Sequence, residues 1–247
     1  MCYMSKIAFL MLFFLFFHTS EVSLAQVTQE EKNLYSWFDK EVGVENTCLL
    51  NGVEYVEKHR TVNEKNSFFL SGAPITASVL YDGEWFHGVQ IKYNVYEDIL
   101  IAQVESNLGF NILQLRKENL KRFEFDQFKF ININVTGSIF NGINEVLLEN
   151  AQFILLKKHA LKFTEKTDQP IKYYEFVPRP IKYGYAYNNV YNELNSRRDL
   201  VSQFPELKES ITEFFRNNNK MYKNQRDTFM VNLFKEITGS LTKEDSL

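Results

Sequence analysis

The feature that most constrains the fold of this chain is a run of period-two alternation that begins at residue 75. From Ile75 to Val177, apolar residues recur at every second position in short runs rich in β-branched and aromatic side chains. Turn sequences such as "DG", "NLG", "TGS" and "NG" separate these runs. This pattern is typical of antiparallel strands with one buried face. We therefore expect a mainly β fold: an antiparallel meander that forms a curled sheet, a sandwich or an open barrel.

One run, "EWFHGVQIKYNVY", places a histidine among apolar residues. Counting alternate positions puts six residues on one strand face: Trp85, His87, Val89, Ile91, Tyr93 and Val95. Asp82 with Gly83, and Glu97 with Asp98, fall at the ends of the run, where acidic residues and glycine suit turn geometry. We expect His87 to lie inside the sheet in a structural role, and the acidic residues to mark turns.

A later run, "IKYGYAYNNVY", carries three tyrosines on one side of an extended strand: Tyr183, Tyr185 and Tyr187. Such a ladder can stack on sugar rings or anchor a protein partner, because tyrosine combines a flat apolar face with a hydroxyl. The alternative is ordinary cross-strand packing. These tyrosines are the candidate ligand-binding or partner-binding residues. The "PRP" sequence before them, Pro178 to Pro180, predicts a rigid loop or an edge strand.

After residue 200 the apolar spacing becomes helical. There are two stripes: Leu207, Ile211, Phe214 and Phe215, then Tyr222, Phe229, Met230, Leu233, Phe234 and Ile237. They predict a helical hairpin over residues 201–247, with the second helix ending at Gly239. We expect its stripes to be buried against each other and the sheet, with burial against a partner protein as the alternative. Residues 26–200 then form the β domain, including a short N-terminal helix in "QEEKNLYSWFDKEV", and the fold is α+β.

The N-terminus has the pattern of a secretory signal peptide. Lys6 precedes the apolar run from Ile7 to Phe17, and the small residues Ser23 and Ala25 suit cleavage before Gln26. We therefore expect residues 1–25 to be removed; a retained signal anchor is the alternative. An eleven-residue apolar core is too short to span a bilayer, which takes about 20 residues. Cleavage would leave Cys48 as the one mature cysteine, interpreted as a small buried hydrophobe.

The chain carries few of the residues that common catalytic sites need. After cleavage the histidines are His59, His87 and His159, and no serine lies in a G-x-S-x-G sequence. His159 shares a strand face with apolar residues and is interpreted as structural, whereas His59 in "EKHRT" has polar neighbours and is expected to be exposed. No metal, cofactor or phosphate-loop motif is present. A formal charge of −3 gives no indication of nucleic-acid binding.

Several stretches resemble a group of uncharacterised exported proteins of Bacteroidota. They are "VGVENTCLLNGVEYVEKHRTVNEKNSFFLSG", "VLYDGEWFHGVQIKYNVYEDIL" and "RRDLVSQFPELKESITEFF". The group shares a similar "NG.EY", a "YDG" turn and a "KYN.YED" strand end, and the resemblance spans about Val42 to Ile237. It implies a location in the cell envelope and gives no catalytic residues.

The sequence therefore predicts an exported, non-catalytic cell-envelope protein that binds a partner protein or an apolar ligand. We expect it in the periplasm or at the periplasmic face of the outer membrane, with secretion as an alternative. Two other functions stay open. A lipid or lipoprotein carrier would need an apolar cavity inside the curled sheet, and an envelope-polymer hydrolase would need two carboxylates that meet in a cleft.

Overall fold

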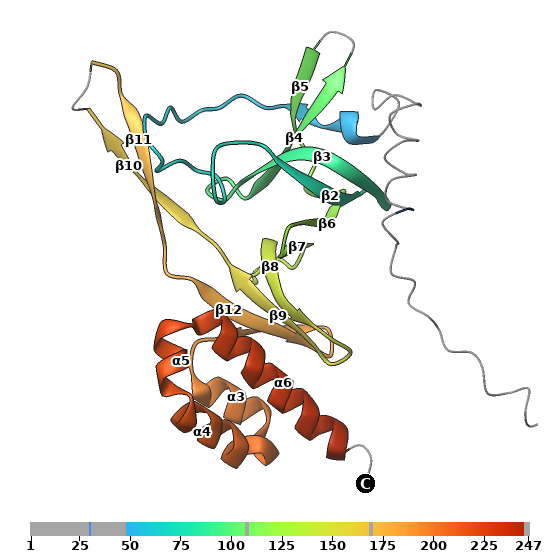
Figure 1. Ribbon diagram of the computed structural model, residues 1–247, viewed down its shortest axis with the longest axis vertical. Coiled ribbons are helices and arrows are strands. Elements are labelled where there is room, and N and C mark those ends of the chain that lie inside the picture. The colour runs from blue at the N-terminus through green and yellow to red at the C-terminus, as the bar shows by residue number, and fades with distance from the viewer. Residues whose placement is uncertain (1–29, 31–47, 107–108, 168–169, 245–247) are drawn as a thin grey trace, which may run out of the picture. The chain divides into compact units, whose positions relative to one another are not determined.

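The computed structural model of the protein describes residue 30 and residues 48–106, 109–167 and 170–244. The chain divides into two compact units, residues 1–34 and 35–247, and every element labelled in Figure 1 belongs to the second. The predicted signal peptide, residues 1–25, lies outside the described residues, as does all of the predicted N-terminal helix except Glu30.

The protein is mainly β, as the alternation predicted, with one eleven-stranded sheet, a separate two-stranded sheet and a helical C-terminal region. The strands are β1 (Val53–Glu54), β2 (Ile75–Tyr81), β3 (Glu84–Asn94), β4 (Ile99–Ser106), β5 (Gly109–Gln114), β6 (Leu120–Phe125), β7 (Phe128–Ile133), β8 (Gly142–Glu149), β9 (Phe153–Lys158), β10 (Leu161–Lys166), β11 (Tyr173–Pro178), β12 (Lys182–Tyr187) and β13 (Val190–Leu194). A short 3-10 helix, η2 (Cys48–Asn51), precedes them.

The large sheet is open, and its strands follow the order β1-β5-β4-β3-β2-β6-β7-β8-β9-β12-β13. β2 to β5 form one antiparallel meander, β6 to β9 form a second, and β6 pairs with the free side of β2. The link from β5 to β6 therefore crosses back over the strand ends. There the Leu115 N–H donates to the Leu100 carbonyl at 2.9 Å and the Asp82 N–H donates to the Asn119 carbonyl at 2.9 Å.

The predicted turns are confirmed at both ends of β3. Asp82 and Gly83 connect β2 to β3 with φ of +52° and +88°, the left-handed values that a tight hairpin requires. Asp98, with φ +55°, ends the turn before β4. Its carboxylate accepts hydrogen bonds from Lys117 Nζ (2.6 Å) and Lys158 Nζ (3.3 Å), so it also ties the turn to the rest of the sheet.

The prediction that His87 shares the core face of β3 was wrong. Val79 lies opposite Phe86 and Ala77 lies opposite Val89, so β3 has one residue more than β2 over this stretch. This β-bulge contains His87 and Gly88, the latter with φ +75°, and it shifts the alternation by one residue. Phe86 therefore takes the core face, while His87 is only half-buried, stacks against Trp85 at 5.9 Å and hydrogen-bonds Ser78 at 2.8 Å.

The alternating run from Ile75 to Val177 does not form one sheet throughout, because β10 and β11 leave the large sheet and pair with each other. The predicted continuous run through His159 breaks after β9. The β8–β9 ladder ends where Glu145 faces Lys157, so the chain beyond Lys158 no longer has β8 as a neighbour. The "PRP" sequence interrupts the chain as predicted, since β11 ends at Pro178 and β12 begins at Lys182.

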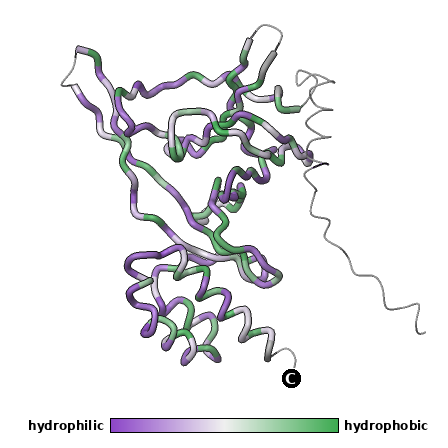
Figure 2. The backbone as a smooth tube through the Cα atoms, in the orientation of Figure 1, coloured by the Kyte–Doolittle hydropathy of each residue, from purple (hydrophilic) through white to green (hydrophobic). Residues whose placement is uncertain are grey.

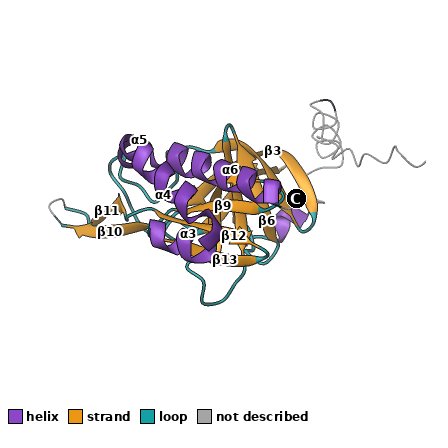
Figure 3. Cartoon of the chain, turned by 90° about the horizontal axis from the view of Figure 1, so that it is seen from below, coloured by secondary structure: helices purple, strands orange, loops and turns teal. Residues whose placement is uncertain are grey.

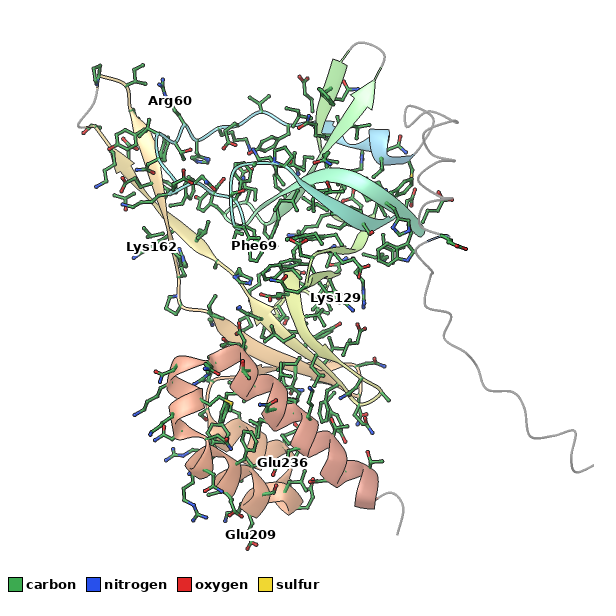
Figure 4. All side chains as sticks on the ribbon, in the orientation of Figure 1. Arg60, Phe69, Lys129, Lys162, Glu209 and Glu236 are labelled. Carbon is green, nitrogen blue, oxygen red and sulfur yellow. The ribbon has the colours of Figure 1, made fainter. Side chains whose placement is uncertain are left out.

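Aromatic rings from β2, β3, β6 and β7 fill the inner face of the large sheet. Phe123 and Phe130 stack with centroids 4.7 Å apart, and Tyr93 packs edge-on to Phe130 at 5.5 Å. Phe69, from the segment before β2, reaches into this cluster and lies 5.2 Å from Phe130 (Figure 4). Cys48 packs against the same core as a half-buried free thiol.

The C-terminal region has more helices than the predicted hairpin. They are α3 (Arg197–Gln203), η3 (Pro205–Leu207), α4 (Lys208–Asn217), α5 (Asn219–Asn224) and α6 (Arg226–Glu244). α3 begins inside the predicted β domain, and α6 continues past Gly239 instead of ending there. Gly239 has ordinary helical φ, so nothing at this position stops the helix.

The burial of the helical stripes within the chain is confirmed. α6 contacts β8 and β9, and α3 contacts β13. Figure 3 shows the helices from below, lying over β9, β12 and β13. One hydrophobic cluster joins β9, β12 and β13 to the helices, with Leu200, Phe204, Phe229 and Phe234 fully buried in it. In Figure 2 the helices carry hydrophilic and hydrophobic residues interspersed, as expected of helices with one covered side.

Candidate functional site

The predicted tyrosine ladder lies on β12, but most of it is inside the molecule. Tyr185 is 1% exposed, Tyr183 is 8% exposed and Tyr187 is half-buried. Tyr185 packs against Phe234 at 5.1 Å, and Tyr187 packs against Phe204 at 5.1 Å. An exposed ladder for stacking on sugar rings was thus the wrong picture; cross-strand packing, the alternative, describes these rings. Tyr183, at the end of the ladder, lines a surface pocket.

A row of cross-strand neighbours passes through Tyr183 from one core to the other. Phe130 on β7 lies opposite Glu145 on β8, Glu145 lies opposite Lys157 on β9, and Lys157 lies opposite Tyr183 on β12. The row thus places two charged residues between the aromatic core of β2 to β8 and the core beneath the helices. Because partners in an antiparallel ladder share a face, their side chains meet.

We call the polar side chains in and beside this row the polar cluster: Glu145, Lys157, His159, Tyr183 and Asp227. Lys157 Nζ lies 2.7 Å from Asp227 Oδ2 and 3.4 Å from Glu145 Oε2. The Tyr183 hydroxyl donates to Asp227 Oδ1 at 2.6 Å, and His159 Nε2 lies 2.6 Å from Glu145 Oε2. Asp227 is in the first turn of α6, so the cluster bonds the helical layer to the sheet.

Two pKa shifts describe the electrostatics of the cluster. Burial raises the pKa of Tyr183, and its hydrogen bond to Asp227 raises it further, so the hydroxyl stays protonated. Burial would raise the pKa of Asp227, but hydrogen bonds from Lys157 and Tyr183 outweigh it and the pKa is lowered. Asp227 is therefore a carboxylate at neutral pH and accepts both bonds.

A pocket of about 560 Å³ opens beside Tyr183, between β12, β13 and the helices. We call it the Arg226 pocket. Its charged lining residues are Lys182, Lys223 and Arg226, its aromatic ones are Tyr183 and Tyr222, and the remainder are Ile181, Leu194 and Asn195. Arg226 places its guanidinium carbon 3.6 Å from the Tyr222 ring centroid and 5.7 Å from that of Tyr183. The pocket thus combines aromatic surface with positive charge.

The histidines that the sequence singled out do not gather at this pocket. His159 belongs to the polar cluster, with Phe69 at 5.0 Å, which fits its structural interpretation. His59 was expected to be exposed, but it is half-buried among four aromatic rings: Tyr96, Phe163, Tyr174 and Phe176. Its neighbours in the sequence are polar, but rings from β10, β11 and the β3–β4 turn surround the His59 ring itself.

The charges around Asp227 and Cys48 limit the catalytic roles that these two side chains could take. Glu145 and Asp227 both approach the same Lys157 ammonium, and the lowered pKa of Asp227 keeps it ionised, so it cannot act as a general acid at neutral pH. Burial, together with Asp82 and Glu84, raises the pKa of the Cys48 thiol, the reverse of what a cysteine nucleophile needs. Within the described ranges, no three His, Cys, Asp or Glu side chains gather as a metal site would require.

Sequence reasoning missed Lys157, Asp227 and Arg226. One signal was available for Lys157, since alternation places it on the same face as Phe153 and Leu155, an unusual position for a lone charge. The sequence contains no such signal for Asp227 or Arg226. Asp227, for example, is 70 residues from Lys157 in the chain.

Comparison with protein-family models, curated proteins and solved structures finds no match to this chain. Among the helices described, none has the length and hydropathy needed to cross a bilayer.

Proposed function

We propose that the protein is a non-catalytic binding protein of the cell envelope and that its ligand or partner binds at the Arg226 pocket. The observation that carries this proposal is the lining of a pocket of about 560 Å³: its described residues include two tyrosines and three cations and no carboxylate. Pockets of roughly 300–1,000 Å³ with aromatic walls and a few charged groups are typical of ligand sites. The envelope location rests on the N-terminal leader pattern and on the resemblance to exported proteins of Bacteroidota.

The aromatic core bears on the carrier alternative. A lipid carrier needs an apolar cavity inside the sheet, but Phe123, Phe130 and Tyr93 pack at ring distances of 4.7 to 5.8 Å there. Phe69 closes over them from the segment before β2. Since close-packed rings leave no room for an acyl chain, this core favours a binding pocket at the surface over carriage inside.

The test is capture of a ligand by the full chain and by matched variants. Purified protein is incubated with an envelope extract, cross-linked mildly and analysed by mass spectrometry. We compare the wild type with Tyr222→Ala/Arg226→Ala and with Lys208→Ala, an exposed residue on α4 outside the pocket. A species bound by the wild type and by Lys208→Ala, but lost from the pocket variant with its circular dichroism intact, is the expected result.

Two outcomes would count against the proposal. One is that all three proteins capture the same species, or none captures any. The other is that the wild type hydrolyses an envelope polymer and that Glu145→Gln or Asp227→Asn abolishes this activity, which would establish the hydrolase alternative.

A further inference from the structure

We propose that the Arg226 pocket recognises an anionic group, a carboxylate or a phosphate, carried on a ligand with an apolar or ring-shaped body. This inference rests on the proposed function and specifies the chemistry of the ligand. Three features of the pocket support it: its uncompensated charge, the way in which Arg226 is held, and the apolar surface beside it.

The charge of the pocket is not neutralised by its own walls. Lys182 is paired with Glu193 at 3.0 Å. In the part of the chain that the structure describes, Lys223 and Arg226 make no ion pair, and no Asp or Glu lines the pocket. Asp227, the nearest residue in sequence to Arg226, is engaged by Lys157 and Tyr183 instead. Two cations that share a concave site without a counter-charge raise the local concentration of anions.

Arg226 is held by an aromatic ring and not by hydrogen bonds. Its guanidinium lies over the face of Tyr222, a contact that uses the π-surface of the ion and leaves its N–H donors unused. Among the described residues it donates no hydrogen bond. A guanidinium fixed in this way can still offer two parallel N–H groups to a carboxylate or a phosphate. Because its orientation is already set, less conformational entropy is lost on binding.

The remaining walls favour an organic anion over a simple inorganic one. Ile181 and Leu194 line the pocket together with the two tyrosines, and Ile181 is 37% exposed. A volume of about 560 Å³ exceeds what one phosphate fills, so the anion would occupy one end and an apolar body would cover the rings.

The probe for this inference is 8-anilinonaphthalene-1-sulfonate, an anion on an aromatic body that fluoresces when bound. We would titrate it into the full-length wild type, Arg226→Gln, Lys223→Gln and the control Lys208→Gln. We expect the Kd to rise about tenfold or more in Arg226→Gln, since a charge-assisted hydrogen bond contributes about 1.5–3 kcal/mol. Lys223→Gln should give a smaller rise, and Lys208→Gln none. Benzoate and phenyl phosphate then compete with the probe, and the stronger competitor identifies the anion.

An uncharged analogue, N-phenyl-1-naphthylamine, separates this inference from the proposed function. If it binds the wild type as tightly as the anionic probe, and Tyr222→Ala weakens both while Arg226→Gln weakens neither, the pocket binds ligands but not by their charge, and the inference is overturned. If neither probe binds, the proposed site fails as well. Binding of the anionic probe that weakens with added salt and with Arg226→Gln supports the inference.

Discussion

The two hairpins that follow β9 both carry aromatic residues but have different surroundings. β10 with β11 and β12 with β13 each carry aromatic residues at alternate positions. The tyrosines of β12 are mostly buried, with β9 and β13 on either side and helices above them. β10 and β11 pair only with each other, and Phe163 on β10 is 39% exposed. In Figure 1 this hairpin extends away from the large sheet, whereas β12 lies within it.

What covers each hairpin explains the difference. β11 is held by the segment before β2: the Tyr174 N–H donates to the Arg60 carbonyl at 2.9 Å and the Phe176 N–H to the Lys65 carbonyl at 2.9 Å. β12, in contrast, pairs with a strand on each side, β9 and β13, and helices pack over its tyrosines. Alternation therefore sets which residues share a face, but the depth of burial depends on segments distant in the chain.

The largest effect should come from removing a ring in the covered hairpin. Tyr185→Ala deletes a side chain that is 1% exposed and packs on Phe153, Phe204 and Phe234, so we expect a loss of about 3–5 kcal/mol in unfolding free energy. Phe163→Ala in the uncovered hairpin should cost less than about 2 kcal/mol, because its ring is partly in water already. Urea unfolding of both variants measures the two losses in unfolding free energy. Equal losses would mean that the two hairpins are buried to the same depth.

The second-largest loss of stability should come from a change at Gly184, on the face of β12 opposite to its tyrosines. A Cβ built at Gly184 would lie 2.1 Å from Phe140 Cζ and 2.5 Å from the Asn192 carbonyl oxygen, which are distances that no real contact allows. Phe140 is 1% exposed and Asn192 belongs to the paired strand, so neither can yield freely. We expect Gly184→Ala to destabilise the protein by about 1–3 kcal/mol in urea unfolding. An unchanged midpoint would show that β12 is not packed from both sides.

The sequence was sufficient where the information is local. The Asp82–Gly83 turn, the interruption at "PRP" and the helical stripes around Phe214 and Phe229 were predicted from neighbouring residues, and the structure has them. His87 was misplaced because a β-bulge shifts the alternation by one residue, and only its Gly88 gave a hint.

The candidate site depended on information that is not local. The Arg226 pocket is lined by residues of α5 and α6 and by residues of β12 and β13. In the chain, α3 and α4 lie between the two strands and these two helices. A charged residue such as Arg226 at the start of a helix has the same appearance in sequence whether it faces solvent or a pocket. The tyrosine ladder lies on β12, beside the pocket, but its exposure depends on helices whose docking no local pattern specifies.

A third prediction concerns the helix that covers β8 and β9. Gly239 lies inside α6 without a positive φ, and a Cβ added there would meet no neighbouring side chain or strand within 4 Å. Alanine should therefore fit without strain and stabilise α6 by about 0.8–1 kcal/mol. A rise in the thermal unfolding midpoint is the expected readout. The matched pair Gly184→Ala and Gly239→Ala makes the same chemical change with opposite expected signs, and a lowered midpoint for Gly239→Ala would mean that α6 does not continue through this position.

The smallest effect should come from Asp227→Asn, which weakens the bond between the helical layer and β12. Burial would raise the folded-state pKa of Asp227, but hydrogen bonds from Lys157 and Tyr183 outweigh it and the pKa is lowered; this carboxylate also lies in the positive first turn of α6. A lowered pKa gives stability that is present above the unfolded-state pKa of about 3.9 and is lost as the pH falls through the folded value. Since the side chain is 45% exposed, the contribution at neutral pH should be about 1 kcal/mol or less.

We expect the wild type to exceed Asp227→Asn in urea stability at pH 7, with the difference shrinking below about pH 4 and in high salt. Asp126→Asn, at an exposed hairpin turn, is the control and should show no such trend. If the difference between wild type and Asp227→Asn were the same at pH 2 and pH 7, the ion pair between Asp227 and Lys157 would not contribute to holding α6 on β9.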